Sequence, residues 1–113
     1  MHEYSIVQAM FERIEEAARA QGAVAVRHVK VRIGELAGVD VGLLQTAYET
    51  FRADTMCDRA TLSVALVPAR WCCPEGHGDL RPGQVLTCTR CGRAARLAAG
   101  DEIMLEQLEL EVP

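Results

Sequence analysis

The sequence Trp-Cys-Cys-Pro-Glu-Gly-His at residues 71–77 and the sequence Cys-Thr-Arg-Cys-Gly at residues 88–92 decide how this chain is organised. Both lie within residues 70–98, a segment that holds four of the five cysteines but few large aliphatic residues. A segment of this composition cannot build a hydrophobic core of its own, so it needs another kind of cross-link to fold.

The spacing of the cysteines and of one histidine indicates a metal site. Cys88 and Cys91 form a C-x-x-C knuckle, in which both thiolates point at one tetrahedral ion. A second C-x-x-C is missing, and Cys73 with His77 forms a C-x-x-x-H pair instead. We predict a closed, structural Zn²⁺ site with the ligands Cys73, His77, Cys88 and Cys91. Replacement of His77 by Cys72 is the alternative, although adjacent cysteines rarely reach one ion without backbone strain.

Two other interpretations of the cysteines stay open. One is a reduced, metal-free loop, and the other is a thioredoxin-like redox site at Cys88 and Cys91. A redox motif of that kind belongs at a helix N-terminus beside a βαβ unit, and neither context is evident from the sequence. Cys57 lies outside the segment and is interpreted as a small apolar residue or a loop residue.

Helical periodicity appears twice outside the cysteine segment. Residues 4–20 carry apolar side chains every three or four positions, with Ser5 as a candidate N-cap and Gly22 as a stop signal. Residues 40–53 show the same period, and Asp40 is a suitable N-cap.

Strand patterns separate and follow the two helices. Residues 24–33, 61–67 and 102–112 alternate apolar and polar side chains. The alternation changes phase between Val26 and Val29, which predicts a β-bulge or a late start of the strand. The predicted fold class is therefore α/β (α+β), a small three-stranded sheet with two helices on one face and an inserted zinc-ribbon module. We place the α/β domain at residues 1–69 and 99–113 and the zinc-binding module at residues 70–98.

Composition excludes several classes of protein. The chain has 113 residues, of which 50% are hydrophobic and 25% charged, as in ordinary globular domains. Its net charge is −4, from 12 basic and 16 acidic residues, which argues against a nucleic-acid partner. No stretch reaches the roughly 20 apolar residues that span a bilayer. The N-terminus lacks the basic region of a secretory signal, so we expect a cytoplasmic protein, where cysteines remain reduced or bind metals.

The N-terminus Met1-His2-Glu3 offers a second metal site. Methionine aminopeptidase acts only before small residues, so Met1 should stay in place and leave a free α-amine next to His2. The amine, the ionisable backbone amide of His2 and its imidazole form fused chelate rings that suit Ni²⁺ or Cu²⁺, with Glu3 adding a carboxylate or a backbone nitrogen. A frayed tail with no metal is the alternative interpretation.

The chain resembles the HypA/HybF nickel metallochaperones of [NiFe]-hydrogenase maturation over nearly its whole length. The resemblance begins with Met-His-Glu-Tyr-Ser-Ile at residues 1–6 and continues with Val-Arg-Ile-Gly-Glu-Leu at residues 31–36. It then covers the helix that ends at Phe51, the cysteine module, and Gly-Asp-Glu-Ile at residues 100–103. The order and spacing of these motifs together make it specific.

The resemblance implies a role for each metal site. His2 would be the essential nickel ligand with Glu3 assisting, in a nickel-binding α/β domain, and the cysteine module would be a zinc ribbon. Nickel would pass to the hydrogenase large subunit with the help of a HypB-type GTPase, and some members also serve urease maturation. Family members commonly hold zinc with two C-x-x-C pairs, whereas this chain has Cys72, Cys73 and His77 in place of the first pair.

The function expected from the sequence is metal delivery by a protein that is not an enzyme. The chain has no recognisable nucleophile–base pair, Gly-rich phosphate loop or two-carboxylate site. The alternative is a zinc-ribbon interaction module for nucleic acid or protein, with a basic edge at Arg90, Arg93 and Arg96.

Overall fold

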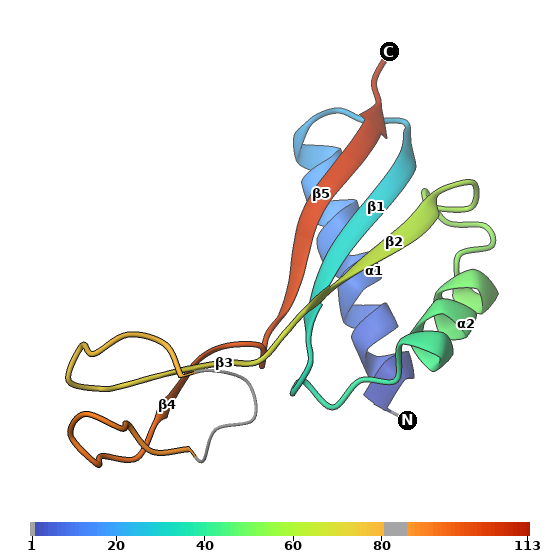
Figure 1. The fold of residues 1–113 in the computed structure, drawn as a ribbon. Helices are drawn as coiled ribbons and strands as arrows, with labels where there is room; N and C mark the ends of the chain where they lie inside the picture. Colours follow the sequence, from blue (N-terminus) through green and yellow to red (C-terminus); the bar gives the residue numbers. More distant parts are fainter. Residues whose placement is uncertain (1, 81–85) are drawn as a thin grey trace.

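The structure, a computed structural model, describes residues 2–80 and 86–113 of the chain (Figure 1). These described residues form two helices and five strands, in the order α1 (His2–Ala20), β1 (Ala25–Gly34), α2 (Val41–Phe51), β2 (Thr61–Val67), β3 (Arg70–Cys72), β4 (Arg96–Ala99) and β5 (Ile103–Glu111). Strands β2, β1 and β5 form one sheet in that order, and β3 pairs with β4 in a separate two-stranded sheet. The molecule is elongated, with extents of 57 × 28 × 17 Å.

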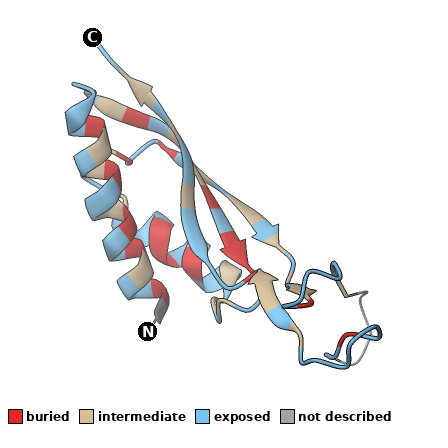
Figure 2. Ribbon diagram, turned by 90° about the vertical axis from the view of Figure 1, so that its left-hand side faces the viewer, coloured by how far each residue is buried: buried red, intermediate tan, exposed pale blue. Residues whose placement is uncertain are grey.

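Both helices cover the same face of the three-stranded sheet, as predicted (Figure 2). Strand β1 lies in the centre, parallel to β2 and antiparallel to β5. The core forms where the helices meet β1, because its apolar side chains at Val26, Val29, Val31 and Ile33 are at most 2% exposed. The register between β1 and β5 shifts between Val26 and His28, which confirms the predicted β-bulge, and shifts again between Lys30 and Val31.

Helix α1 begins at His2, two residues earlier than predicted, so the prediction of Ser5 as its N-cap is wrong. The apolar stripe alone suggested a later start because the first turn holds only polar residues and Tyr4. The predicted stop at Gly22 is confirmed. Gly22 has a φ of +67° and donates to Arg19 O, and the next N–H, from Ala23, donates to Ala18 O, which is the Schellman pattern.

Helix α2 begins after Asp40, whose carboxylate accepts a hydrogen bond from Leu43 N at 3.0 Å, so this N-cap is confirmed. The helix ends at Phe51, two residues before the predicted end. Its buried side chains pack on α1, where the rings of Phe11 and Tyr48 stack with their centroids 5.5 Å apart. Tyr48 also donates from its hydroxyl to Ala60 O at 2.9 Å.

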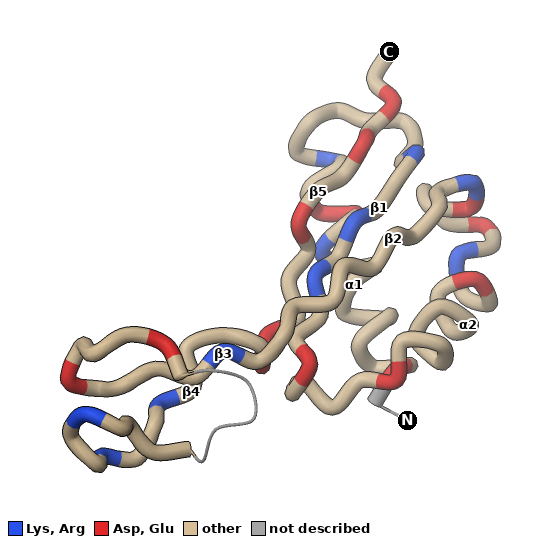
Figure 3. The backbone as a smooth tube through the Cα atoms, in the orientation of Figure 1, with Lys and Arg blue, Asp and Glu red and all other residues tan. Residues whose placement is uncertain are grey.

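The other face of the sheet carries charged side chains. Basic residues of β1 stand beside acidic residues of β5 (Figure 3), with Arg27 3.0 Å from Glu111 and Lys30 3.4 Å from Glu106. These pairs are partly exposed, and such pairs typically contribute about 0–1 kcal/mol each. They keep this face polar. None of the helices in the described part of the chain has the length and hydropathy needed to cross a bilayer.

The chain passes between the two sheets twice, through Pro68–Ala69 and through Gly100–Asp101. We call these two connections together the neck. The loop after β1 forms hydrogen bonds with both connections of the neck. The Glu35 carboxylate accepts from Ala69 N at 2.7 Å, and Leu36 N donates to Gly100 O at 2.7 Å. A Cβ on Gly34 would lie 2.2 Å from the Gly100 carbonyl carbon, so the two glycines are in direct backbone contact. The 70–98 segment therefore leaves the α/β sheet at one fixed point.

Candidate functional site

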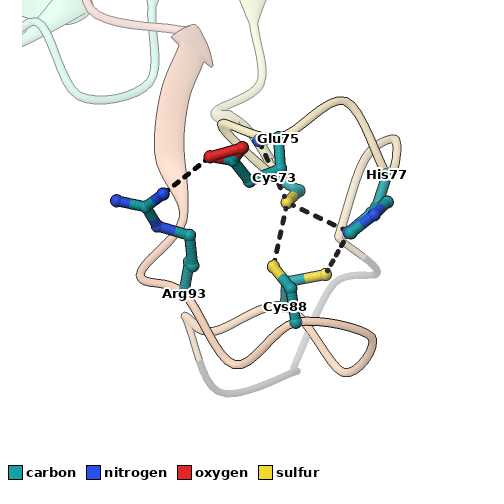
Figure 4. Close-up of polar contacts among 6 residues, drawn as sticks. Cys73, Glu75, His77, Cys88 and Arg93 are labelled. Carbon is teal, nitrogen blue, oxygen red and sulfur yellow. Dashed lines mark hydrogen bonds and ion pairs between the residues drawn. The ribbon is translucent and has the colours of Figure 1, made fainter.

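Two tight loops beyond the neck carry the predicted zinc ligands. In the first, Cys73 N donates to Gly78 O at 3.0 Å and Gly76 N donates to Cys73 O at 3.1 Å. In the second, Gly92 N donates to Cys88 O at 2.8 Å, and Gly92 has a φ of +72°, which an L side chain rarely adopts. Each loop folds back on itself so that its ligand side chains face the other loop (Figure 4).

Four ligand atoms converge between these loops. The sulfurs of Cys73, Cys88 and Cys91 and a ring nitrogen of His77 all lie within 4.8 Å of one another. Three of the contacts measure 3.5 Å, namely from Cys73 Sγ to His77 Nδ1, from Cys73 Sγ to Cys91 Sγ, and from Cys88 Sγ to His77 Nδ1. Atoms bound at 2.0–2.3 Å to one tetrahedral zinc ion lie about 3.3–3.8 Å apart. The cluster therefore has the size and the donor types that a zinc ion requires.

The backbone of each loop stabilises negative charge on a sulfur. Glu75 N donates to Cys73 Sγ and Arg90 N donates to Cys88 Sγ, each at 3.3 Å. Hydrogen bonds from the backbone of Arg90 and Cys91 lower the pKa of Cys88 to about 6. Burial disfavours the Cys73 thiolate, but the N–H groups of Glu75 and His77 still hold the pKa of Cys73 below its ordinary value. Thiolates are the form that binds metal, so the backbone of the two loops favours that form at Cys73 and Cys88.

The hydrogen bond with Cys88 raises the pKa of His77.

A salt bridge of 2.6 Å between Arg93 and Glu75 connects the second loop to the first (Figure 4). These supporting contacts were not predicted. The C-x-x-C spacing is a signal that could have indicated the N–H donor to Cys88, because the residue two positions after a knuckle cysteine offers its N–H to that sulfur. The salt bridge has no such signal, because it depends on the pairing of the two loops.

The remaining cysteines lie outside the cluster. Cys72 lies in β3, opposite Arg96 of β4, and forms an isolated bridge with Asp79, so the structure does not bring it to the other four residues. Cys57 is 1% exposed in the core, where burial raises the pKa of its thiol to about 11, as expected for a small apolar residue. None of the five cysteines, all of which lie in the described residues, forms a disulfide.

The redox interpretation gains no support from the surroundings of Cys88 and Cys91. The structure contains a βαβ unit, which β1, α2 and β2 form with the two strands parallel. This unit lies on the other side of the neck from the cysteines. The residues after Cys91 form an irregular segment with an isolated bridge at Ala94 and then strand β4, so the knuckle does not stand at a helix N-terminus.

The N-terminal candidate residues lie far from the cysteine cluster, at the end of α1 that faces α2 (Figure 1). Met1 lies outside the described residues, and His2 is the first residue of α1. Glu3 is 8% exposed, and its Oε2 accepts a hydrogen bond from Asp40 N at 3.2 Å. The carboxylate of Glu3 therefore joins the start of α1 to the start of α2. Sequence reasoning missed this link, because the partners are 37 positions apart in the chain.

Comparisons with known proteins agree with this arrangement. Residues 1–110 match the family described as hydrogenase/urease nickel incorporation, metallochaperone, hypA. Hydrogenase maturation factor HypA from Shewanella oneidensis is 38% identical over 113 residues, which cover 98% of this chain and 96% of that protein. The HypA of Nitrosospira multiformis is also 38% identical, over 97% of both chains.

Two solved structures share the fold. The solution structure of a HypA protein superimposes with a TM-score of 0.82 at 29% identity and covers 100% of this chain and 98% of that one. The solution structure of the Ni metallochaperone HypA from Helicobacter pylori gives a TM-score of 0.75 at 28% identity, with 98% of each chain covered. Sequence and structure thus agree over the whole length, and the chain belongs to the HypA family of hydrogenase and urease nickel-incorporation metallochaperones.

Proposed function

We propose that this chain is a nickel metallochaperone for [NiFe]-hydrogenase maturation that carries Ni(II) at its N-terminus. The observation that carries the proposal is the family match, which includes the N-terminal residues from Met1 onward. The start of α1 at His2 supports it, because the first four N–H groups of a helix have no intrahelical acceptor. The backbone nitrogen of His2 is therefore not committed to a helical hydrogen bond.

The nickel ligands in this proposal are the Met1 amine, the His2 amide and imidazole, and one donor from Glu3. We assign the Glu3 donor to its backbone nitrogen, because its carboxylate is buried and accepts from Asp40 N. A set of nitrogen donors suits a planar Ni(II) ion. The site stands at a chain end with few rigid ligands, which suits an ion that must be released to a client.

We further propose that Cys73, His77, Cys88 and Cys91 hold a structural zinc ion. Three sulfurs and one imidazole nitrogen close a tetrahedral ligand set with no open position, as structural sites require. The ion would replace the hydrophobic core that residues 70–98 lack. These residues form the zinc module, while residues 1–69 and 99–113 form the nickel-binding domain, with the boundary at the neck.

The partners in this proposal are a HypB-type GTPase, the hydrogenase large subunit and, if the chain also serves urease, the urease maturation proteins. The protein works in the cytoplasm, catalyses no reaction of its own, and binds neither nucleic acid nor a membrane. Its acidic net charge of −4 supports the exclusion of nucleic acid.

A nickel titration of zinc-loaded protein with its native N-terminus tests the proposal. The wild type should bind one equivalent of Ni(II) with a planar-nickel absorbance band, and His2→Ala should lose the band but keep its zinc. A chain extended by one glycine before Met1 should also lose it, because the α-amine moves away. Equal binding by the wild type and both variants, or no binding by any of them, would overturn the nickel site.

One observation favours the alternative, a zinc-ribbon module that binds nucleic acid or protein. Residues 70–98 hold five arginines against two acidic residues, although the chain as a whole is acidic. Two of these arginines are paired, Arg70 with Asp79 and Arg93 with Glu75. A salt-sensitive gel shift with duplex DNA would support the nucleic-acid form of this alternative, and no shift at low salt would remove it.

A further inference from the structure

The aromatic residues of this chain are few and gather at one place. Four of its five aromatic side chains lie where α1 meets α2. Phe11 and Tyr48 form the inner pair, and Tyr48 is 1% exposed. Tyr4 and Phe51 form the outer pair, edge to face with centroids 5.3 Å apart, yet they are 47% and 51% exposed. About half of each side chain of the outer pair is therefore exposed to solvent, where it can contact a partner.

A groove of about 430 Å³ lies against this outer pair. Its lining comes from one side of α1 and from the end of α2, namely Tyr4, Val7, Gln8, Phe11, Glu12, Glu15 and Phe51. The volume falls in the range of about 300–1,000 Å³ that is usual for binding pockets. At 1.5 Å per residue, the lining from Tyr4 to Glu15 extends about 16 Å along α1, or three helical turns. We call this feature the helix groove.

The two ends of the helix groove differ in chemistry. The end at Tyr4 and Phe51 is aromatic, while the other end carries the carboxylates of Glu12 and Glu15. Glu12 has no ion-pair partner among residues 2–80 and 86–113, and Glu15 has only Arg19 at 3.6 Å, in a largely exposed pair. Exposed pairs of this kind are weak, so both carboxylates can accept a cationic partner.

We propose that the helix groove binds an amphipathic, basic helix of a partner protein. A third helix fits the space between two helices, and a length of three turns matches anchors at positions i, i+3 or i+4, and i+7. The apolar anchors of that helix would pack on Tyr4 and Phe51, and its Lys or Arg side chains would face Glu12 and Glu15. Tyr and Phe are enriched at the centres of protein interfaces, which agrees with this role.

A second copy of this chain is the poorer occupant. Each copy has a net charge of −4 and the same carboxylates beside its groove, so pairing two grooves brings like charges together. The groove also begins two residues after His2. If the N-terminus carries nickel, which rests on the proposed function, a partner seated there has its apolar end beside the metal. The binding of the helix itself does not depend on nickel.

A peptide titration followed by amide NMR tests this proposal on zinc-loaded, nickel-free full-length protein. The probe is a synthetic helix of about 14 residues, four turns, with Leu at helical spacing and Lys on both flanks. The matched peptide has Glu in place of every Lys. The groove variants are Phe51→Ala and Glu12→Lys. Their controls outside the groove are Leu43→Ala, which removes a side chain of α2 that is 57% exposed, and Glu16→Lys, which makes the same charge change on α1.

The Lys peptide should shift the resonances of Tyr4, Phe11 and Phe51, and the Glu peptide should not. Phe51→Ala and Glu12→Lys should each weaken binding about tenfold or more, as interface anchors do, while both controls stay within about twofold. Unchanged amide shifts outside the groove will show that the variants are folded. The proposal is overturned if the Lys peptide fails to bind, if the Glu peptide binds equally, or if the shifts lie elsewhere. It is also overturned if the free protein forms dimers that Phe51→Ala dissociates. A failed nickel titration would leave all these readouts intact.

Discussion

The backbone contacts at the neck predict how much stability is lost when glycine is replaced by alanine at Gly34 and Gly100, with Gly22 at the end of α1 as the reference. Gly22 has a φ of +67°, and a Cβ there meets nothing within 4 Å. Gly34 lacks a positive φ, but its Cβ would lie 2.2 Å from the Gly100 carbonyl carbon. Gly100 combines both features, with a φ of +106° and a Cβ position 2.5 Å from Ala69 Cα. The alanine variants at these positions therefore separate backbone strain from steric clash.

The expected losses of unfolding free energy follow from these geometries. Gly22→Ala should cost about 1–2 kcal/mol, the penalty for an L residue in the left-handed region. Gly34→Ala should cost about 1–3 kcal/mol, because the surrounding atoms are backbone and cannot move away cheaply. Gly100→Ala should cost the sum, about 2–5 kcal/mol. A chain of this length has roughly 6–17 kcal/mol of stability, so all three variants should still fold.

Urea unfolding of the zinc-loaded proteins, followed by far-UV circular dichroism, measures these losses. With a slope of about 1–3 kcal/mol/M, a loss of 3 kcal/mol moves the midpoint by about 1–3 M, well above experimental error. The order should be Gly100→Ala, then Gly34→Ala, then Gly22→Ala, with equal slopes and unchanged zinc content. If Gly100→Ala is no more destabilising than Gly22→Ala, the close contact of Gly100 with Pro68 and Ala69 does not hold the two connections of the neck together.

Three further predictions concern protonation, thiol reactivity and one buried hydroxyl. Zinc should be retained at pH 7 and released only below pH 6, because the pKa of the metal-free Cys88 thiol is about 6 and the bound ion lowers it further before acid protonates the ligands. His77→Ala should release zinc at higher pH than the wild type, and a colorimetric zinc assay checks both. In zinc-loaded protein at pH 8, iodoacetamide should modify Cys72 first and Cys57 last, because burial raises the pKa of Cys57 to about 11, and peptide mass spectrometry gives the order. Tyr48→Phe should cost only about 0.5–1.5 kcal/mol in urea unfolding, because the acceptor Ala60 O keeps a hydrogen bond from Arg52 Nη1 at 2.9 Å; a loss above 3 kcal/mol would contradict this reasoning.

Local signals in the sequence predicted the parts of the fold that depend on neighbouring residues. The carboxylate of Asp40 caps α2, Gly22 ends α1, and the phase change after Val26 marks a β-bulge. Strands β3 and β4 were not predicted, because strands of three and four residues are too short to show an alternating pattern. The start of α1 was also missed, since its first turn lacks the apolar residues that define the stripe.

In the candidate sites too, contacts within one loop were predicted and contacts between distant parts of the chain were not. The C-x-x-C and C-x-x-x-H spacings predicted the four residues that converge, because each pair lies within a single loop. The contacts of Glu3 with Asp40 N and of Glu35 with Ala69 N join residues 37 and 34 positions apart. Neither contact has a local signal, since each depends on how the loop after β1 lies across the fold.

The neck also bears on how this chain has evolved. Arg70 and Ala99 are paired partners in β3 and β4, so the inserted segment enters and leaves the α/β sheet at adjacent positions. An inserted segment whose two ends lie side by side can be replaced by another segment, because even a short turn from Ala69 to Gly100 would close the chain without disturbing strands β2, β1 and β5. Substitutions among the proposed metal ligands are then shielded from the rest of the protein. Pairs such as Cys73 and His77 can be exchanged for other ligand pairs, which would change the metal affinity of the proposed zinc site, while the N-terminal end of the molecule keeps its architecture.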